Sequence, residues 1–67
     1  MGVIYELGDE YIYGTIVRIF PNIYGTSYLV MTKKDDIYSI FRDKDLLCQG
    51  LGKQEMTDLF KKYQEEL

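Results

Sequence analysis

The side chains able to act as nucleophiles include Ser27, Ser39 and Cys48, and the 67-residue chain contains no histidine to serve as their base. Nucleophilic catalysis needs a base held beside the nucleophile, so only a carboxylate, a lysine or a tyrosine could take that role. No spacing in the sequence is typical of such a pair. Cys48 follows Leu46 and Leu47, and a cysteine in such a run is usually a small buried apolar side chain. We therefore expect a protein that is not an enzyme.

Two pairs of aspartates are candidates for binding a divalent metal ion. Asp43 and Asp45 form a D-x-D pair, and Asp35 and Asp36 are adjacent. A calcium loop of the EF-hand type needs a third oxygen ligand where Leu47 stands and a later bidentate glutamate, and the sequence provides neither. The sequence instead predicts a polar hairpin tip at Asp35 and Asp36 and a solvated connection from Asp43 to Asp45. We expect no metal, no cofactor and no small-molecule substrate.

The seven tyrosines outnumber the three phenylalanines. A core closed to solvent favours rings without a hydroxyl, whereas tyrosine suits half-wet surfaces and is enriched at protein interfaces. On one strand Tyr11 and Tyr13 would share a face, and Tyr28 and Tyr38 are expected on neighbouring strands. The tyrosines either pack across strands with their hydroxyls in solvent or form a protein-binding patch. For the patch we expect Tyr11, Tyr13 and Tyr38 as anchors, with Ile23 and Tyr24 at a projecting hairpin tip.

Nucleic-acid binding is a second function class, which would use basic residues beside the aromatic rings of the sheet. The candidate rim consists of Arg18, Lys33, Lys34 and Arg42. Exposed rings with a cationic rim are typical of proteins that bind single-stranded nucleic acid. However, eight basic and eleven acidic residues give the chain a net charge of −3 and a pI of about 4.7. That balance disfavours binding to a phosphate backbone, so nucleic acid is the less favoured partner.

The sequence predicts short antiparallel strands over the first two-thirds of the chain. Runs rich in β-branched and aromatic residues are expected as strands at residues 3–7, 11–20, 27–33 and 37–42. Turn-forming residues separate them at 8–10, 21–25 and 34–36. Residues 43–49 predict either a short fifth strand or a tight helical turn. A meander is the simplest topology for strands joined by such short connections.

The last third of the chain has the apolar period of a helix. Met56, Leu59, Phe60, Tyr63 and Leu67 fall on one helical face, with charged and amide side chains opposite. Gly52 or Thr57 is expected to cap its start. The sequence thus predicts a single α+β domain over residues 1–67. It comprises an antiparallel meander of four to five strands (residues 1–49) and a C-terminal amphipathic helix (residues 53–67).

Both faces of the predicted sheet are apolar. In the second strand, one face is expected to carry Ile12, Gly14, Ile16, Arg18 and Phe20, and the other Tyr11, Tyr13, Thr15, Val17 and Ile19. The third and fourth predicted strands show the same pattern. One helix covers only one face of a sheet. The sheet is therefore expected either to curl into a small barrel of the SH3-like or OB-like kind or to bury its second face against another chain.

Compartment and partner follow from the same composition. The apolar runs are only a few residues long, and the sequence does not open with a basic region followed by a long apolar one, so we expect no membrane span and no secretory signal. A lone cysteine fits a reducing compartment, and we expect a cytoplasmic protein. Our hypothesis is a non-enzymatic interaction or regulatory module that binds through a tyrosine-rich sheet face. Its expected partner is another protein or a second copy of the chain, giving a dimer.

Overall fold

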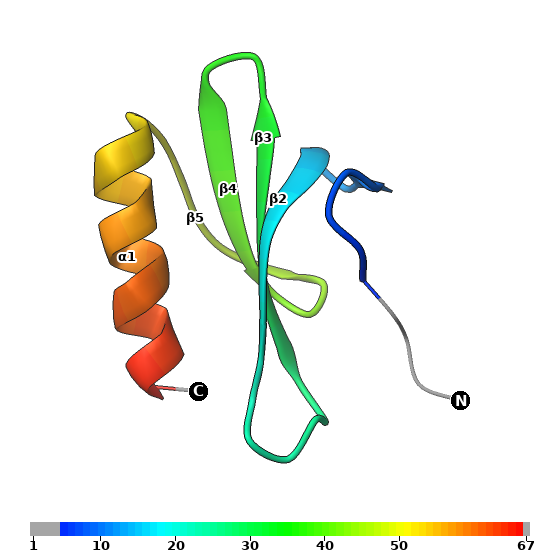
Figure 1. Ribbon diagram of the computed structural model, residues 1–67. Helices are drawn as coiled ribbons and strands as arrows, with labels where there is room; N and C mark the ends of the chain where they lie inside the picture. The colour runs from blue at the N-terminus through cyan, green and yellow to red at the C-terminus, as the bar shows by residue number, and fades with distance from the viewer. Residues whose placement is uncertain (1–4, 67) are drawn as a thin grey trace.

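The computed structural model describes residues 5–66, which form a five-stranded antiparallel sheet followed by one helix (Figure 1). The elements are β1 (Glu10–Tyr11), β2 (Gly14–Pro21), β3 (Tyr28–Lys34), β4 (Ile37–Arg42), β5 (Asp45–Leu51) and α1 (Lys53–Glu66). Each strand pairs with its neighbour in sequence, in the order β1-β2-β3-β4-β5. The predicted α+β meander with a C-terminal helix is confirmed, and the ambiguous segment after β4 is a fifth strand.

Helix α1 covers one face of the sheet and builds the larger core with β3, β4 and β5. The buried residues of this core are Leu29, Met31, Tyr38, Ile40, Met56 and Phe60. The carbonyl of Gly52 accepts a hydrogen bond from the Met56 amide at 3.1 Å, so Gly52 caps the helix. The alternative cap, Thr57, is wrong, because Thr57 lies within the helix and is buried. Of the predicted apolar face of the helix, Met56 and Phe60 are buried and Tyr63 packs against them. Leu59 is 36% exposed, so its predicted place on the buried face is wrong, and Leu67 lies outside the described residues.

The opposite face of the sheet carries a second, smaller core. Ile16, Val30 and Phe41 are buried there, with Tyr5, Tyr11, Ile19 and Tyr28 packed against them. The Tyr5 ring meets the rings of Tyr11 and Tyr28 edge-on, with centroids 5.6 and 5.1 Å apart. Such contacts stabilise beyond the area that they bury. The segment before β2 thus covers the second face, and the sheet of residues 5–66 stays open with β1 and β5 as its edges, so the predicted small barrel is wrong.

The first hairpin also differs from its prediction. Residues 5–7 form no strand, and residues 3 and 4 of the expected strand lie outside the described residues. The turn falls at Ile12 and Tyr13 instead of residues 8–10, and it divides the expected strand 11–20 into β1 and β2. Gly14 has a φ of +114°, and a Cβ there would stand 2.4 Å from the Lys33 carbonyl oxygen. Only glycine can follow the turn at so close an approach to β3.

A β-bulge at Val17 distributes the side chains of β2 differently from a regular strand. The register shifts between Ile16 and Arg18, so Val17 is an extra residue in the ladder with β3. Ile16 and Ile19 therefore both face the second core, whereas Arg18 and Phe20 face α1. The predicted grouping of Ile16 with Arg18 and Phe20 is wrong because strict alternation fails at a bulge. In β3 and β4 the predicted alternation is confirmed.

Candidate protein-interaction site

The connection between β2 and β3 carries the two most exposed large apolar side chains of residues 5–66. Ile23 is 86% exposed and Tyr24 is 78% exposed. Figure 1 shows this connection projecting beyond the C-terminal end of α1. Two adjacent apolar side chains in such a position bury little surface within their own chain and leave that surface exposed to solvent.

Hydrogen bonds of Asn22 hold the backbone of residues 22–27, which we call the tip. The Asn22 Oδ1 accepts hydrogen bonds from the amides of Thr26 at 2.9 Å and Ser27 at 3.4 Å, and Nδ2 donates to the Thr26 hydroxyl at 3.2 Å. The Asn22 amide donates to the Ser27 carbonyl at 2.9 Å, and its carbonyl accepts from the Gly25 amide at 3.1 Å. These bonds fix the backbone of the tip, and a backbone that is already ordered loses less conformational entropy whenever it takes part in an interface.

Asp43 fastens the base of the same hairpin to the turn between β4 and β5. Its carboxylate accepts hydrogen bonds from the Ser27 hydroxyl at 2.7 Å and the Tyr28 amide at 3.0 Å. Its own amide donates to the Tyr28 carbonyl at 2.8 Å, and its carbonyl accepts from the Tyr11 hydroxyl. The predicted solvated connection is wrong for Asp43, which is half-buried. Both carboxylate oxygens are occupied, so Ser27 serves as a structural donor.

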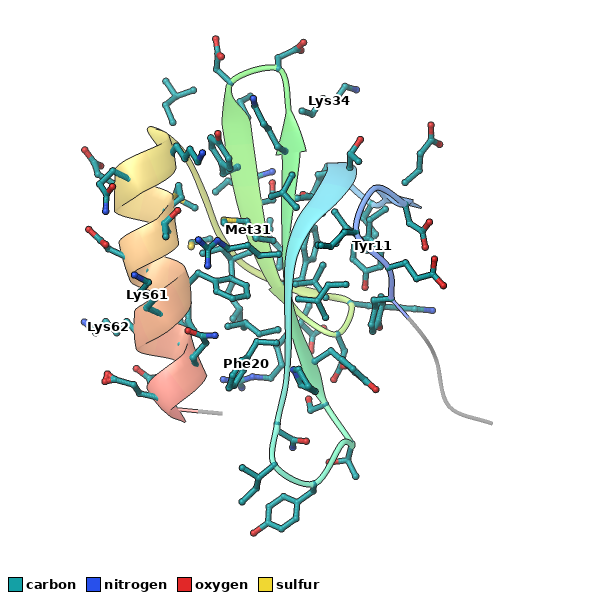
Figure 2. The ribbon with its side chains drawn as sticks, in the orientation of Figure 1. Tyr11, Phe20, Met31, Lys34, Lys61 and Lys62 are labelled. Carbon is teal, nitrogen blue, oxygen red and sulfur yellow. The ribbon has the colours of Figure 1, made fainter. Side chains whose placement is uncertain are left out.

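The structure separates Tyr38 from the other two predicted anchors, Tyr11 and Tyr13, whose rings both contact the ring of Phe41. Tyr13 is 48% exposed and stacks on Phe41, with ring centroids 5.9 Å apart. Tyr11 lies on the side of β2 away from α1, as Figure 2 shows, and packs in the second core. Tyr38 is only 8% exposed and belongs to the core beneath the helix. The expected exposed face shared by all three is therefore wrong, because alternation along β4 turns Tyr38 toward α1.

The pKa values of the Tyr11 hydroxyl and the Cys48 thiol are both raised. Burial raises the pKa of Tyr11 well above its ordinary value of 10.0, and a hydrogen bond with Tyr5 and the charge of Asp43 act in the same direction. Burial also raises the pKa of the Cys48 thiol above 9.0, and a hydrogen bond from the Tyr63 hydroxyl partly opposes that rise. Both groups stay protonated at neutral pH, which suits hydrogen-bond donors and buried packing residues.

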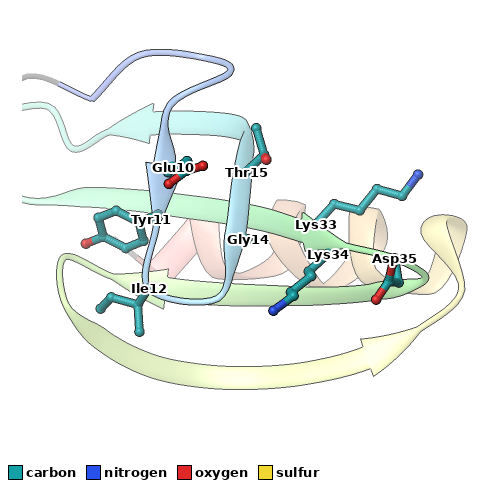
Figure 3. Close-up of a pocket in the computed structure, with 8 residues that line it drawn as sticks. All are labelled: Glu10, Tyr11, Ile12, Gly14, Thr15, Lys33, Lys34 and Asp35. Carbon is teal, nitrogen blue, oxygen red and sulfur yellow. The ribbon is translucent and has the colours of Figure 1, made fainter.

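Of the four basic residues predicted as a nucleic-acid rim, Arg18 and Lys33 lie near each other, whereas Lys34 and Arg42 lie apart from them. Arg18 and Lys33 stand over buried rings on the helix side of the sheet. Lys34 leaves β3 in a different direction from Lys33, as Figure 3 shows. Arg42 lies at the other end of β4, where its charge opposes the rise that burial causes in the pKa of Tyr63. This arrangement gives no continuous track for a phosphate backbone along these residues.

The remaining polar features are turns. Asp35 and Asp36 connect β3 to β4, which confirms the predicted polar hairpin tip.

Within residues 5–66, no group of three or more carboxylate and thiol side chains is arranged to hold a metal ion. The one helix of the described chain is too short and too polar to cross a membrane.

Comparisons with protein-family models, with curated proteins and with solved structures find no match to this chain. A function for this chain is therefore inferred from where the structure places its side chains. By that criterion the tip is the strongest site, because its two apolar residues are exposed while the aromatic rings of the sheet are packed.

Sequence reasoning places Ile23 and Tyr24 at a projecting tip but misses the residues that hold it. Asn22 has a local signal, because asparagine side chains commonly accept hydrogen bonds from amides a few residues further along a turn. Asp43 has none, because its partners Tyr28 and Ser27 are 15 and 16 residues away in the chain. A contact of that kind follows from the pairing of strands and is read only from the fold.

Proposed function

We propose that this chain is a non-enzymatic interaction module that binds a partner protein through Ile23 and Tyr24. The observation that carries the proposal is an apolar pair, 86% and 78% exposed, on a backbone closed by Asn22. Tyrosine is among the side chains that supply most of the binding energy at protein interfaces when they enter a pocket, and a neighbouring isoleucine adds buried apolar area. The complementary surface is an apolar groove with a hydrogen-bond acceptor for the Tyr24 hydroxyl.

The surroundings of the tip suit the rim of such an interface. A groove of about 620 Å³ lies beside it, and its lining includes Thr26, Tyr28, Lys44 and Asp45. Protein interfaces commonly combine an apolar centre with a polar, solvent-accessible rim. The tip supplies the centre, and the turn between β4 and β5 supplies charged side chains of both signs.

The test compares a tip variant with a matched surface variant. In the variant Ile23→Ser with Tyr24→Ser, the tip loses its apolar surface without changing a core residue. The control, Leu7→Ser with Leu51→Ser, removes side chains that are 67% and 66% exposed elsewhere. Each protein is immobilised, source-cell lysate is passed over it with and without nuclease, and retained proteins are quantified.

We expect the wild type and the control to retain the same partner in both samples, and the tip variant to lose it. With the purified partner, the tip substitutions should weaken binding at least about tenfold, as expected for central interface residues. Equal retention by the tip variant contradicts the site, and retention that disappears with nuclease contradicts the partner class. Sedimentation equilibrium of the wild type and the tip variant shows whether a second copy of the chain occupies the tip.

A further inference from the structure

A small groove lies between β2, β3, β4 and the first turn of α1, away from the tip. Its volume is about 330 Å³, and three of the eight basic residues of the chain line it: Arg18, Lys33 and Lys53. Tyr38 and Met31 lie at its buried side. The groove therefore combines a cationic mouth with an aromatic and apolar wall.

The charge of this groove is unbalanced, unlike that of other lysine-bearing surfaces of the molecule. Its lining holds no carboxylate. By contrast, the surface hollow that contains Lys61 and Lys62 also contains Asp58 and Glu65. In a chain with net charge −3, three cations around one hollow without a lining carboxylate repel one another in the absence of an anion.

The three cationic side chains are exposed to solvent, and two of them stand over aromatic rings. The Arg18 guanidinium carbon lies 6.0 Å from the centroid of the Phe60 ring, and the Lys33 ammonium nitrogen lies 5.8 Å from that of Tyr38. Both rings are buried and so offer fixed supports. Lys53 is the first residue of α1, where the helix dipole is positive and a cation is unfavourable. The fold gains nothing electrostatically from a lysine there, whereas an anion in the groove would.

We infer that this groove binds the phosphate group of a small organic ligand. Arg18 supplies a planar pair of donors for phosphate oxygens, and Lys33 and Lys53 supply ammonium donors from the other sides. The Tyr38 and Met31 wall contacts the organic body attached to the phosphate. This site is separate from the tip, so the inference does not depend on the proposed function.

The experiment measures thermal unfolding in phosphate and in chloride at equal ionic strength. A ligand that binds only the folded state raises the midpoint, and phosphate at ten times its dissociation constant should raise it by about 10 °C for a domain of this size. The groove variant replaces Arg18, Lys33 and Lys53 by Gln. The control variant replaces Lys44, Lys61 and Lys62 by Gln, which changes the net charge equally outside the groove.

We expect the rise in the wild type, in the control variant and in the Ile23→Ser, Tyr24→Ser tip variant, and no rise in the groove variant. Equal rises in the groove and control variants, or none in the wild type, overturn the inference. If the triple groove variant does not fold, Lys53→Gln alone gives the same comparison with at least about a threefold weaker affinity.

A second measurement locates the ligand and tests its organic part. Two-dimensional NMR titration with phosphate should shift the amide signals of Arg18, Lys33, Lys53 and Thr57 before those of residues 22–27. Phenyl phosphate should bind at least about threefold more tightly than inorganic phosphate, because its ring contacts the apolar wall. Equal affinities contradict an organic ligand, and shifts spread evenly over all basic residues contradict the site.

Discussion

The tetrapeptide Ile-Tyr-Gly-Thr occurs twice in the chain, at residues 12–15 and 23–26, and the two copies behave differently. In the first copy the turn folds back over the sheet, where Tyr13 stacks on Phe41 and its carbonyl accepts a hydrogen bond from buried Thr32 at 2.8 Å. In the second copy Ile23 and Tyr24 project into solvent. Their exposed fractions are 86% and 78%, against 51% and 48% for Ile12 and Tyr13.

The difference teaches that the surroundings, not the four residues, decide what each copy does. Gly14 approaches the backbone of β3 so closely that a Cβ would clash with it, whereas a Cβ on Gly25 would meet nothing within 4 Å. The first copy is held by the second core. The second copy is held by hydrogen bonds from Asn22 and by Asp43 at its base, which leaves its apolar side chains exposed to solvent.

The largest expected effect comes from adding one methyl group to each copy. Gly14→Ala should lower the free energy of unfolding by at least about 3 kcal/mol, because its Cβ would displace the backbone of β3. Gly25→Ala should lower it by only about 1 kcal/mol, the ordinary penalty of a left-handed conformation. Urea denaturation of both variants measures the two losses. Equal losses would show that the two glycines are under the same constraint.

Asp43 tests how the tip is fastened to the sheet. Asp43→Ala removes the acceptor of two hydrogen bonds from the base of the tip, and should lower the free energy of unfolding by about 2 kcal/mol. Asp43 has a φ of +55°, in the left-handed region that asparagine tolerates. Asp43→Asn also keeps an acceptor, and should lose less than half as much. Asp36→Ala in the exposed turn is the control, with a loss within about 0.5 kcal/mol. If Asp43→Ala lowers the free energy of unfolding no more than the control does, the hydrogen bonds of the Asp43 carboxylate do not stabilise the fold.

The tyrosines of the two copies should have opposite roles. Tyr13→Ala loses the stacking contact with Phe41 and should reduce the free energy of unfolding by about 1.5 kcal/mol, while Tyr24→Ala should change it by less than about 0.5 kcal/mol. In partner binding the order should reverse, with Tyr24→Ala the more damaging. Thermal denaturation and a titration with the purified partner measure the two quantities. If the same variant is the more damaging in both assays, the two copies do not divide into a structural copy and a binding copy.

The smallest effect appears only at alkaline pH. Burial raises the folded-state pKa of Tyr11 above 10.0 and that of Cys48 above 9.0, so the unfolded chain ionises first as pH increases. Stability is therefore fully present below about pH 9 and falls as pH rises further. Tyr11→Phe should reduce the steepness of the fall between about pH 10 and 11, as followed by urea denaturation at several pH values. An unchanged slope in this variant would assign the fall to other groups.

The sequence predicts the parts of this fold that depend on local period. The amphipathic face of α1, the alternation in β3 and β4, and the aspartate turn between them all follow from spacing alone. The first hairpin does not, because residues 11–20 are uniformly strand-forming and the turn depends on a close approach of Gly14 to β3. The bulge at Val17 likewise arises from pairing across strands, and it changes the faces on which β2 side chains lie.

The candidate site divides in the same way. A projecting tip at Ile23 and Tyr24 is expected from the sequence, because Pro21 ends the second strand and Gly25 lets the chain turn back. Tyr38 lies beneath α1. Its burial cannot be predicted without knowing which face of the sheet the helix covers, and the sequence alone therefore predicts Tyr38 in an exposed patch. The hydrogen bonds of Asp43 cannot be predicted from the sequence, because they join two turns that come together only once the strands between them have paired.

The sequential order of the strands bears on how the chain reaches this structure. Every strand pairs with the one that precedes or follows it, so each hairpin closes only a short loop. Topologies dominated by such local pairing have low contact order and fold faster than sheets with distant partners. During synthesis each of the strands β2 to β5 leaves the ribosome after the strand with which it pairs, and α1 follows the strands that it covers.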